Sequence, residues 1–182
     1  MKHDLLVFKL KSESFITRDK ILEILKEFKS IKGLLTLQSF NINYVISYAQ
    51  IQSAVWHATQ GYNTQKMISN NLSIEILLFL SGQRQISKAF KILGLPKKAN
   101  KFGLILIIEN IENIKKNIIK EIERMFKDSP VSVSPYESEF DLSNLEDFKK
   151  IYEIDNNNLF LDKLKLEGLI LSKISLLKIN NY

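Results

Sequence analysis

The stretch Ser73–Gly94 restricts the fold more than any other part of the chain, because it predicts two helices separated by a glycine. Its first half is apolar on nearly every side, which is typical of a buried helix. Its second half is amphipathic, and the predicted inward stripe consists of Ile86, Ala89, Phe90 and Leu93. Gly82 is expected to close the first helix in the left-handed conformation, and Gly94 is expected to close the second. We therefore expect a buried helix that leads through a tight turn into a surface helix.

The turn after Gly82 has the features of an anion site. Gln83, Arg84 and Gln85 are predicted at the start of the second helix, where free backbone N–H groups and an arginine can bind a phosphate. No Asp or Glu occurs between Glu75 and Glu109. That interval contains six cationic residues, Arg84, Lys88, Lys91, Lys97, Lys98 and Lys101. The alternative role of Arg84 is a structural ion pair with a local carboxylate such as Glu75, which is otherwise expected to point outward or to pair with a lysine.

The remaining elements predict an α+β fold in a single domain, residues 1–182. Alternating or continuous apolar runs predict strands at 4–11, 34–40 and 102–108, the last buried on both faces. Val131 and Val133 suggest a short edge strand. Helical spacing and capping residues predict helices from Thr17 to about residue 29, with Leu22 inward, and then from Ser47, Asn110, Ser143 and Leu159. The expected architecture is a small, mostly antiparallel sheet of three to four strands covered by several helices.

Composition favours a soluble globular protein. Hydrophobic residues make up 45% of the 182-residue chain and charged residues 25%. Met1–Asp4 leads directly into a strand-like stretch, so we expect no signal peptide. No apolar run reaches the roughly 18–20 residues that a membrane span needs, and we expect no membrane partner. The absence of Cys fits a reducing cytoplasm and excludes a disulfide framework.

Charge is distributed unevenly along the chain. Residues 1–127 contain twice as many basic as acidic side chains, whereas residues 128–182 contain more acidic than basic ones. A basic body followed by an acidic segment suggests two surfaces with different partners. The basic part is compatible with nucleic-acid binding, and equally with lysines that only maintain solubility.

Few residues indicate catalysis. Neither a phosphate-binding glycine loop nor a nucleophile elbow is present, and no cofactor is expected. His57 is interpreted as a surface or partly packed histidine, because neither it nor His3 has a second ligand at metal-binding spacing. One acidic trio could hold Mg²⁺, although a solvated surface explains it as well: Glu137, Glu139 and Asp141.

The central stretch resembles the motif of the small kinase-binding subunit of the KEOPS complex, the PRPK-binding protein family. In that motif a glutamate and an apolar helix precede Ser-Gly-x-Arg-Gln-Ile and an amphipathic helix. The sequence EILLFLSGQRQISKAFKILG matches it at Glu75, Ser81, Gly82, Arg84, Gln85 and Ile86. The order of predicted elements from the first strand to the last helix also follows the family.

The resemblance implies a subunit without catalytic residues of its own. KEOPS makes threonylcarbamoyl-adenosine on tRNA, and a separate transferase subunit performs the chemistry. The implied direct partner is the atypical kinase/ATPase subunit, which bridges the small subunit to the transferase. A second implied partner is the single-stranded 3′ CCA end of tRNA. The tRNA-binding residues carried over on this basis are Arg84, Gln83, Gln85, Ile86, Lys66 and Lys88. For Ile86, periodicity alone favours core packing instead.

The last helix is the candidate kinase contact. It contains more apolar side chains than one core-facing stripe requires, and surplus apolar surface on a terminal helix is often a partner surface. The predicted contact residues are Leu164, Leu169, Leu171, Ile174 and Leu177. The alternative is a helix fully wrapped in the core.

Three hypotheses about function follow from the sequence. The first is a non-catalytic adaptor that regulates the kinase and holds the tRNA tail. The second is a protein-interaction module that binds the kinase without contacting RNA. The third is a metal-dependent hydrolase that uses the acidic trio. Salt-dependent binding of tRNA separates the first from the second, and Mg²⁺-dependent turnover would support the third.

Overall fold

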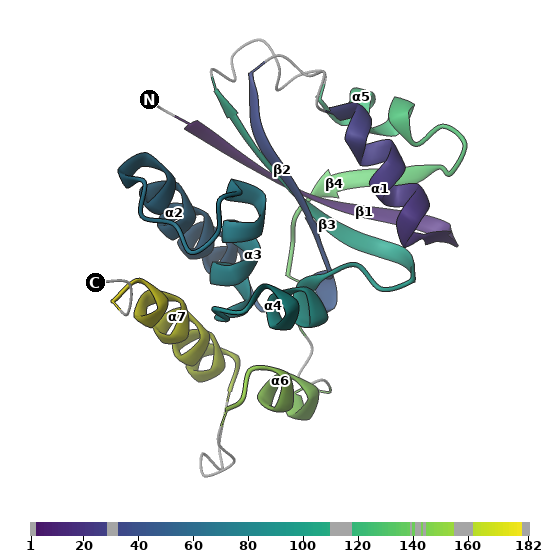
Figure 1. Cartoon of the computed structure of the whole chain (residues 1–182). Helices are drawn as coiled ribbons and strands as arrows, with labels where there is room; N and C mark the ends of the chain where they lie inside the picture. Colours follow the sequence, from purple (N-terminus) through teal and green to yellow (C-terminus); the bar gives the residue numbers. More distant parts are fainter. Residues whose placement is uncertain are drawn as a thin grey trace. The chain divides into compact units, whose positions relative to one another are not determined.

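The structure, a computed structural model, describes residues 3–28, 33–109, 118–138, 140, 143, 145–154 and 162–179. These residues form two compact units (Figure 1). The sheet unit comprises the described parts of Met1–Ile42 and Leu95–Tyr136, and the helical unit comprises those of Asn43–Gly94 and Glu137–Tyr182. Seven α-helices and four strands occur in the described residues, which confirms the predicted α+β class. The prediction of a single domain stays a prediction.

The sheet is antiparallel, with strand order β2-β3-β1-β4. Its strands are β1 (His3–Thr17), β2 (Leu34–Phe40), β3 (Lys98–Glu109) and β4 (Val131–Pro135). All four strand predictions are confirmed, and β1 runs beyond the predicted end at Lys11 through a register irregularity. Residues 102–108 of β3 are buried without interruption, as expected for the continuous apolar run of an inner strand.

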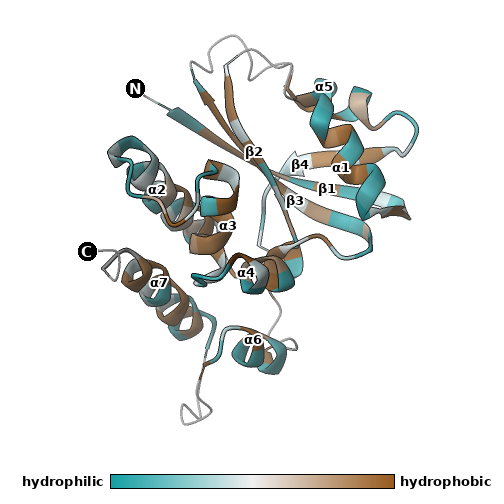
Figure 2. Cartoon of the chain, viewed as in Figure 1, coloured by the Kyte–Doolittle hydropathy of each residue, from teal (hydrophilic) through white to brown (hydrophobic). Residues whose placement is uncertain are grey.

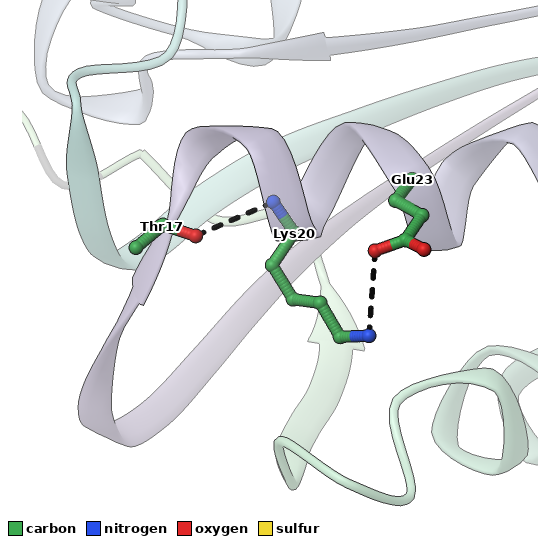
Figure 3. A network of polar contacts seen from close by, with 3 residues as sticks. All are labelled: Thr17, Lys20 and Glu23. Atoms are coloured by element: carbon green, nitrogen blue, oxygen red, sulfur yellow. Dashed lines mark hydrogen bonds and ion pairs between the residues drawn. The ribbon is translucent and has the colours of Figure 1, made fainter.

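Two helices pack on the sheet through one apolar cluster. Leu10, Phe102 and Leu104 belong to that cluster on the sheet side, and helices α1 (Arg18–Glu27) and α5 (Ile118–Met125) contribute the rest. The predicted cap of α1 is confirmed, since Thr17 Oγ1 accepts a hydrogen bond from Lys20 N at 3.3 Å (Figure 3). On the surface of this helix Lys20 also pairs with Glu23 at 3.4 Å.

The inward position of Leu22 was wrong, because its side chain is 43% exposed while the neighbouring Ile24 is buried. The apolar residues of α1 cover a broad arc, so helical spacing alone does not determine its centre. The predicted start of the α5 helix at Asn110, and of the last helix at Leu159, lies outside the described residues.

An inner-strand glycine accommodates a large aromatic ring in the sheet unit. Phe40 lies opposite Gly103 in the β2–β3 register and is completely buried. A Cβ atom added to Gly103 would overlap the Cζ, Cε1 and Cε2 atoms of the Phe40 ring. The ring also contacts Tyr136, with 6.0 Å between the centroids. The Phe40 ring therefore occupies the space that a side chain at position 103 would need.

The helical unit is organised around α3 (Leu72–Ser81), which is buried along almost its whole length. This helix contacts α2 (Tyr48–Thr64), α4 (Ile86–Leu93) and α7 (Lys163–Ile179). Figure 2 shows the strongly hydrophobic character of α3. The unit also contains α6 (Leu145–Ile151), and a short 3-10 helix, η2 (Ile42–Tyr44), connects β2 to α2. In the described part of the chain, no helix has the length and apolar character that crossing a membrane requires.

Candidate functional site

The turn between α3 and α4 has the predicted glycine geometry. Gly82 adopts a φ of 64° and closes α3 in the left-handed conformation. Its N–H donates to the Phe79 carbonyl, and Gln83 N–H donates to the Leu78 carbonyl, each at 3.0 Å. This pair of bonds satisfies carbonyls at the helix end that would otherwise lack partners. Residues with a Cβ adopt this φ less readily, so glycine is favoured where the chain reverses at this point.

Three of the predicted RNA-binding residues are exposed next to one another after this turn. Arg84 and Gln85 lie at the surface, and the Ile86 side chain is 43% exposed. Gln85 is the N-cap of α4 but forms no side-chain capping bond. The first backbone N–H groups of α4 therefore have no side-chain cap and carry the positive end of the helix dipole. Gln83 differs from the other three, because it is largely buried.

The inward stripe predicted for α4 was partly wrong. Ala89 and Leu93 are buried as expected, but Ile86 and Phe90 are about half-exposed and Ile92 is buried in their place. The apolar positions of this short helix span a wide arc, and its contact with α3 selects only part of that arc. The prediction that Gly94 closes this helix is confirmed, because Gly94 is the C-cap of α4 and its N–H donates to the Phe90 carbonyl at 2.9 Å. The half-exposed Ile86 and Phe90 side chains therefore form an exposed apolar strip beside Arg84.

A buried hydrogen-bond network around Gln50 contacts the end of α3, directly before the turn. Gln50 is fully buried, and its Nε2 donates to the Leu80 carbonyl at 2.8 Å and to the Tyr152 hydroxyl oxygen at 3.0 Å. Its Oε1 accepts from Ile46 N at 2.9 Å, and the Tyr152 hydroxyl donates to the Tyr44 carbonyl. The predicted capping role of Ser47 is confirmed, whereas the Gln50 side chain bonds into the core. The network therefore holds the last turn of α3 against two distant segments.

The motif glutamate has a structural role that was not predicted. Glu75 is fully buried rather than pointing outward, and its carboxylate accepts hydrogen bonds from Ile68 N at 3.0 Å and Ser69 N at 2.8 Å. It thus holds the loop that precedes α3. Burial raises the pKa of Glu75 above its usual value, and the two backbone N–H groups act in the opposite direction.

This raised pKa gives a pH prediction. The folded protein binds a proton at Glu75 more tightly than the unfolded chain, whose carboxyl keeps its ordinary value near 4.5. The contribution of Glu75 to the free energy of unfolding should therefore increase as pH falls through the raised pKa toward 4.5, and decrease as pH rises. Urea unfolding of wild type and Glu75→Gln over this range measures it as the difference between the two curves. A difference that grows with increasing pH would contradict this assignment.

The two predicted lysines occupy different places. Lys88 lies on α4 and forms an exposed ion pair with Glu153 at 3.7 Å. Lys66 is exposed in the loop before α3, and its backbone N–H donates to the Gly61 carbonyl at 2.9 Å. Lys66 therefore precedes the first turn of α3, whereas the glycine turn follows its last turn. The ten-residue helix between them spans about 15 Å.

A pocket next to the turn brings in residues that the sequence did not suggest. It has a volume of about 360 Å³ and is lined by Tyr44, Gln83, Lys88, Lys91, Ile92, Lys150, Ile151 and Glu153. Lys91 could have been found from its spacing of three residues from Lys88 on one helix. Lys150 and Glu153 carry no such signal, because only the tertiary structure brings the end of α6 to α4.

The predicted kinase-contact residues divide according to burial. Ile174 is fully buried and Leu177 is 7% exposed, so these two side chains pack in the core. Leu164 is 79% exposed, and Leu169 and Leu171 are partly exposed. Of the predicted contact residues, Leu164, Leu169 and Leu171 therefore offer surface on α7. Leu176, which was not among the predicted residues, is also 55% exposed.

The sequence offered the acidic trio and His57 as candidates for a metal site. Among the residues that the structure describes, no cluster of His, Asp and Glu could hold a metal ion. Of the acidic trio, Glu137 is exposed, while Glu139 and Asp141 lie outside the described residues. The interpretation of His57 as partly packed is confirmed, since its ring stacks on Phe79 with centroids 5.4 Å apart.

Fold and site together define an α+β protein with an exposed basic turn after a buried helix. The family model described as kinase binding protein CGI-121 matches residues 6–178, which is nearly the whole chain. The protein therefore belongs to the CGI-121 family of kinase binding proteins, and the family indicated by the Ser81–Ile86 motif is confirmed. No individual curated protein matches the sequence closely enough to add to this assignment.

Proposed function

We propose that the protein is a non-catalytic, cytoplasmic subunit of the KEOPS complex, which makes threonylcarbamoyl-adenosine on tRNA. In this role it binds and regulates the atypical kinase/ATPase subunit directly, contacts the transferase subunit only through that kinase, and holds the 3′ CCA end of tRNA. The observation that carries the RNA part is the joint exposure of Arg84, Gln85 and Ile86 at the start of α4. Family membership supports the kinase part.

The chemistry of a single-stranded RNA end matches this turn. Such an end presents phosphates, base edges and unstacked base faces, which require cations, hydrogen-bonding groups and apolar surfaces. Arg84 can bind a phosphate in a bidentate manner or stack on a base, and the Gln85 amide can bond to a base edge. The exposed Ile86 and Phe90 side chains can pack against base faces. Lys88 adds positive charge one turn further along α4.

For the kinase we propose the exposed part of α7. Among the described residues, Leu164 is the most exposed large apolar side chain, and Leu169 and Leu171 add partly exposed surface on the same helix. Exposed leucines on a regular helix are typical of helix-mediated recognition between proteins. Ile174 and Leu177 then support this surface from the core.

A protein-interaction module without RNA contact is the alternative function. Family membership supports it equally, since kinase binding alone satisfies the family description. The exposed basic turn favours the RNA-binding function, because a protein that only binds a kinase has no need for uncapped N–H groups beside an unburied arginine.

Removal of the terminal CCA from tRNA should abolish most of the binding measured by gel shift, and Arg84→Glu should weaken binding of intact tRNA about ten- to hundredfold. The expected size follows from losing a hydrogen-bonded charge contact worth about 1.5–3 kcal/mol. Kinase co-purification should stay unchanged in this variant, because the surface proposed for the kinase is on α7.

Arg18→Glu is the matched control, because it makes the same charge change at an exposed position of the sheet unit. It should leave tRNA affinity within about twofold of the wild type. Equal binding of intact and trimmed tRNA would reject tail holding. Kinase co-purification without any salt-dependent tRNA shift would establish the interaction module instead.

A further inference from the structure

The pocket beside the turn is lined by both cationic and apolar side chains. Lys88 and Lys91 enter it from α4, and Lys150 enters it from the end of α6. Tyr44, Ile92 and Ile151 provide ring and aliphatic surface in the same pocket. Its volume of about 360 Å³ falls at the lower end of the range for small-molecule sites. These properties suit a ligand that combines a phosphate with a flat, weakly polar ring.

One carboxylate stands among these cations. Glu153 pairs with Lys88 at 3.7 Å, and both side chains remain more than half exposed. Its backbone has a φ of 51°, which is unusual for a residue with a Cβ. The Lys173 ammonium donates to the Glu153 carbonyl at 3.2 Å and also to the Tyr152 carbonyl. The tertiary contact with α7 thus holds Glu153 in a strained conformation at the pocket.

The other two lysines keep their charge available. Within the part of the chain that the structure describes, neither Lys91 nor Lys150 forms an ion pair, whereas Lys149 pairs with Glu146 at 2.7 Å. Both side chains are exposed. Counting the described residues alone, two lysines without an ion pair and one weakly paired lysine give the pocket a net positive charge that a single carboxylate does not neutralise.

We propose that this pocket binds the phosphate of a nucleotide between Lys88, Lys91 and Lys150, and that the Glu153 carboxylate takes the place of that phosphate while the site is empty. A phosphate attracts lysine ammonium groups more strongly than a carboxylate does, since it carries more charge and more acceptor oxygens. Glu153 therefore acts as a resident competitor that lowers nucleotide affinity and prevents tight binding of unrelated anions. The nucleotide belongs to RNA or is free, and only the first case rests on the proposed function.

Replacing the competitor should strengthen binding. Glu153→Gln removes one exposed ion pair, and we expect the affinity for a nucleotide phosphate to rise about three- to fivefold. Lys150→Gln should lower it and should reduce the slope of log affinity against log salt by about 0.7 for single-stranded RNA. Glu146→Gln is the matched control, because it makes the same charge change on α6 at a residue that does not line the pocket.

Two probes distinguish the sources of the phosphate. The first is AMP, titrated into ¹⁵N-labelled full-length protein while the amide signals of Lys91, Lys150 and Glu153 are followed by NMR. The second is a fluorescent eight-nucleotide RNA ending in CCA, measured by anisotropy. Stronger binding of either probe to Glu153→Gln supports the proposal, and response to AMP alone assigns the pocket to free nucleotides even if tail holding fails.

Two results would overturn the proposal. In the first, the RNA binds, but Glu153→Gln and Lys150→Gln bind it like the wild type and AMP shifts none of the three amides. Tail holding would then stand without the pocket. In the second, Glu146→Gln strengthens binding as much as Glu153→Gln, which would reduce the effect to overall charge. Thermal unfolding of each variant confirms that the helical unit is intact.

Discussion

Gln50→Leu is expected to lower the free energy of unfolding of the helical unit by about 3–5 kcal/mol. The leucine fills a similar volume but leaves the Ile46 N–H and the Leu80 carbonyl without the partners that Gln50 provides. It also removes the donor to the Tyr152 hydroxyl. A buried polar group without a partner costs about 1–3 kcal/mol, and three groups lose a bond here.

The effect should reach the proposed RNA site. Leu80 directly precedes the Ser81-Gly82 turn. Loss of the hydrogen bond to the Leu80 carbonyl should therefore let the end of α3 open more often, so that the Gly82 and Gln83 amides exchange faster with solvent. Urea unfolding followed by circular dichroism measures the stability, and hydrogen exchange at these two amides measures the local opening. Gln52→Leu is the control on the exposed face of the same helix, and its effect should stay within about 0.5 kcal/mol. Similar losses in both variants would contradict the role of the network.

Gly103→Ala should destabilise the sheet unit by about 2–4 kcal/mol, although alanine is the better residue for the strand backbone. The new methyl group would overlap the buried Phe40 ring, and that ring has no open space to enter because it is completely buried against Tyr136. The strand or the ring must therefore shift. Thermal and urea unfolding of the variant measure the cost.

A double-mutant cycle tests the cause of this cost. Phe40→Leu makes room near Gly103, so Gly103→Ala should cost at least about 1–2 kcal/mol less in that background. Gly168→Ala is the control with the opposite sign. Gly168 lies in α7 with nothing within 4 Å of an added Cβ, and alanine there should stabilise the helix by up to about 1 kcal/mol. An additive cycle would show that the ring is not responsible.

The sequence predicted those parts of the molecule that depend on neighbouring residues. The bounds of β2, the caps Thr17 and Ser47, and the left-handed Gly82 follow from local patterns, because a cap or a turn is formed by residues a few positions apart. The exposed Arg84 and Gln85 followed in turn, since a glycine that ends one helix places the next residues at the start of another.

Long-range contacts account for the features that were missed. The spacing of α4 did not decide which apolar positions face inward, and Ile86 is exposed because α3 covers a different part of the helix. The Glu75 side chain was expected to point outward, because helical spacing carries no information about its hydrogen bonds to the loop before α3. Glu153 and Lys150 follow α4 by more than fifty residues and join Lys88 only in the folded helical unit.

The sequence by itself thus determined the order and type of the elements, the glycine turn and the family. The tertiary structure decided which side chains are buried, where Gln50 and Glu75 place their hydrogen bonds, and which charges share a pocket. The physical reason is that backbone propensity and capping act over a few residues, whereas burial and charge pairing depend on segments that meet only when the chain folds.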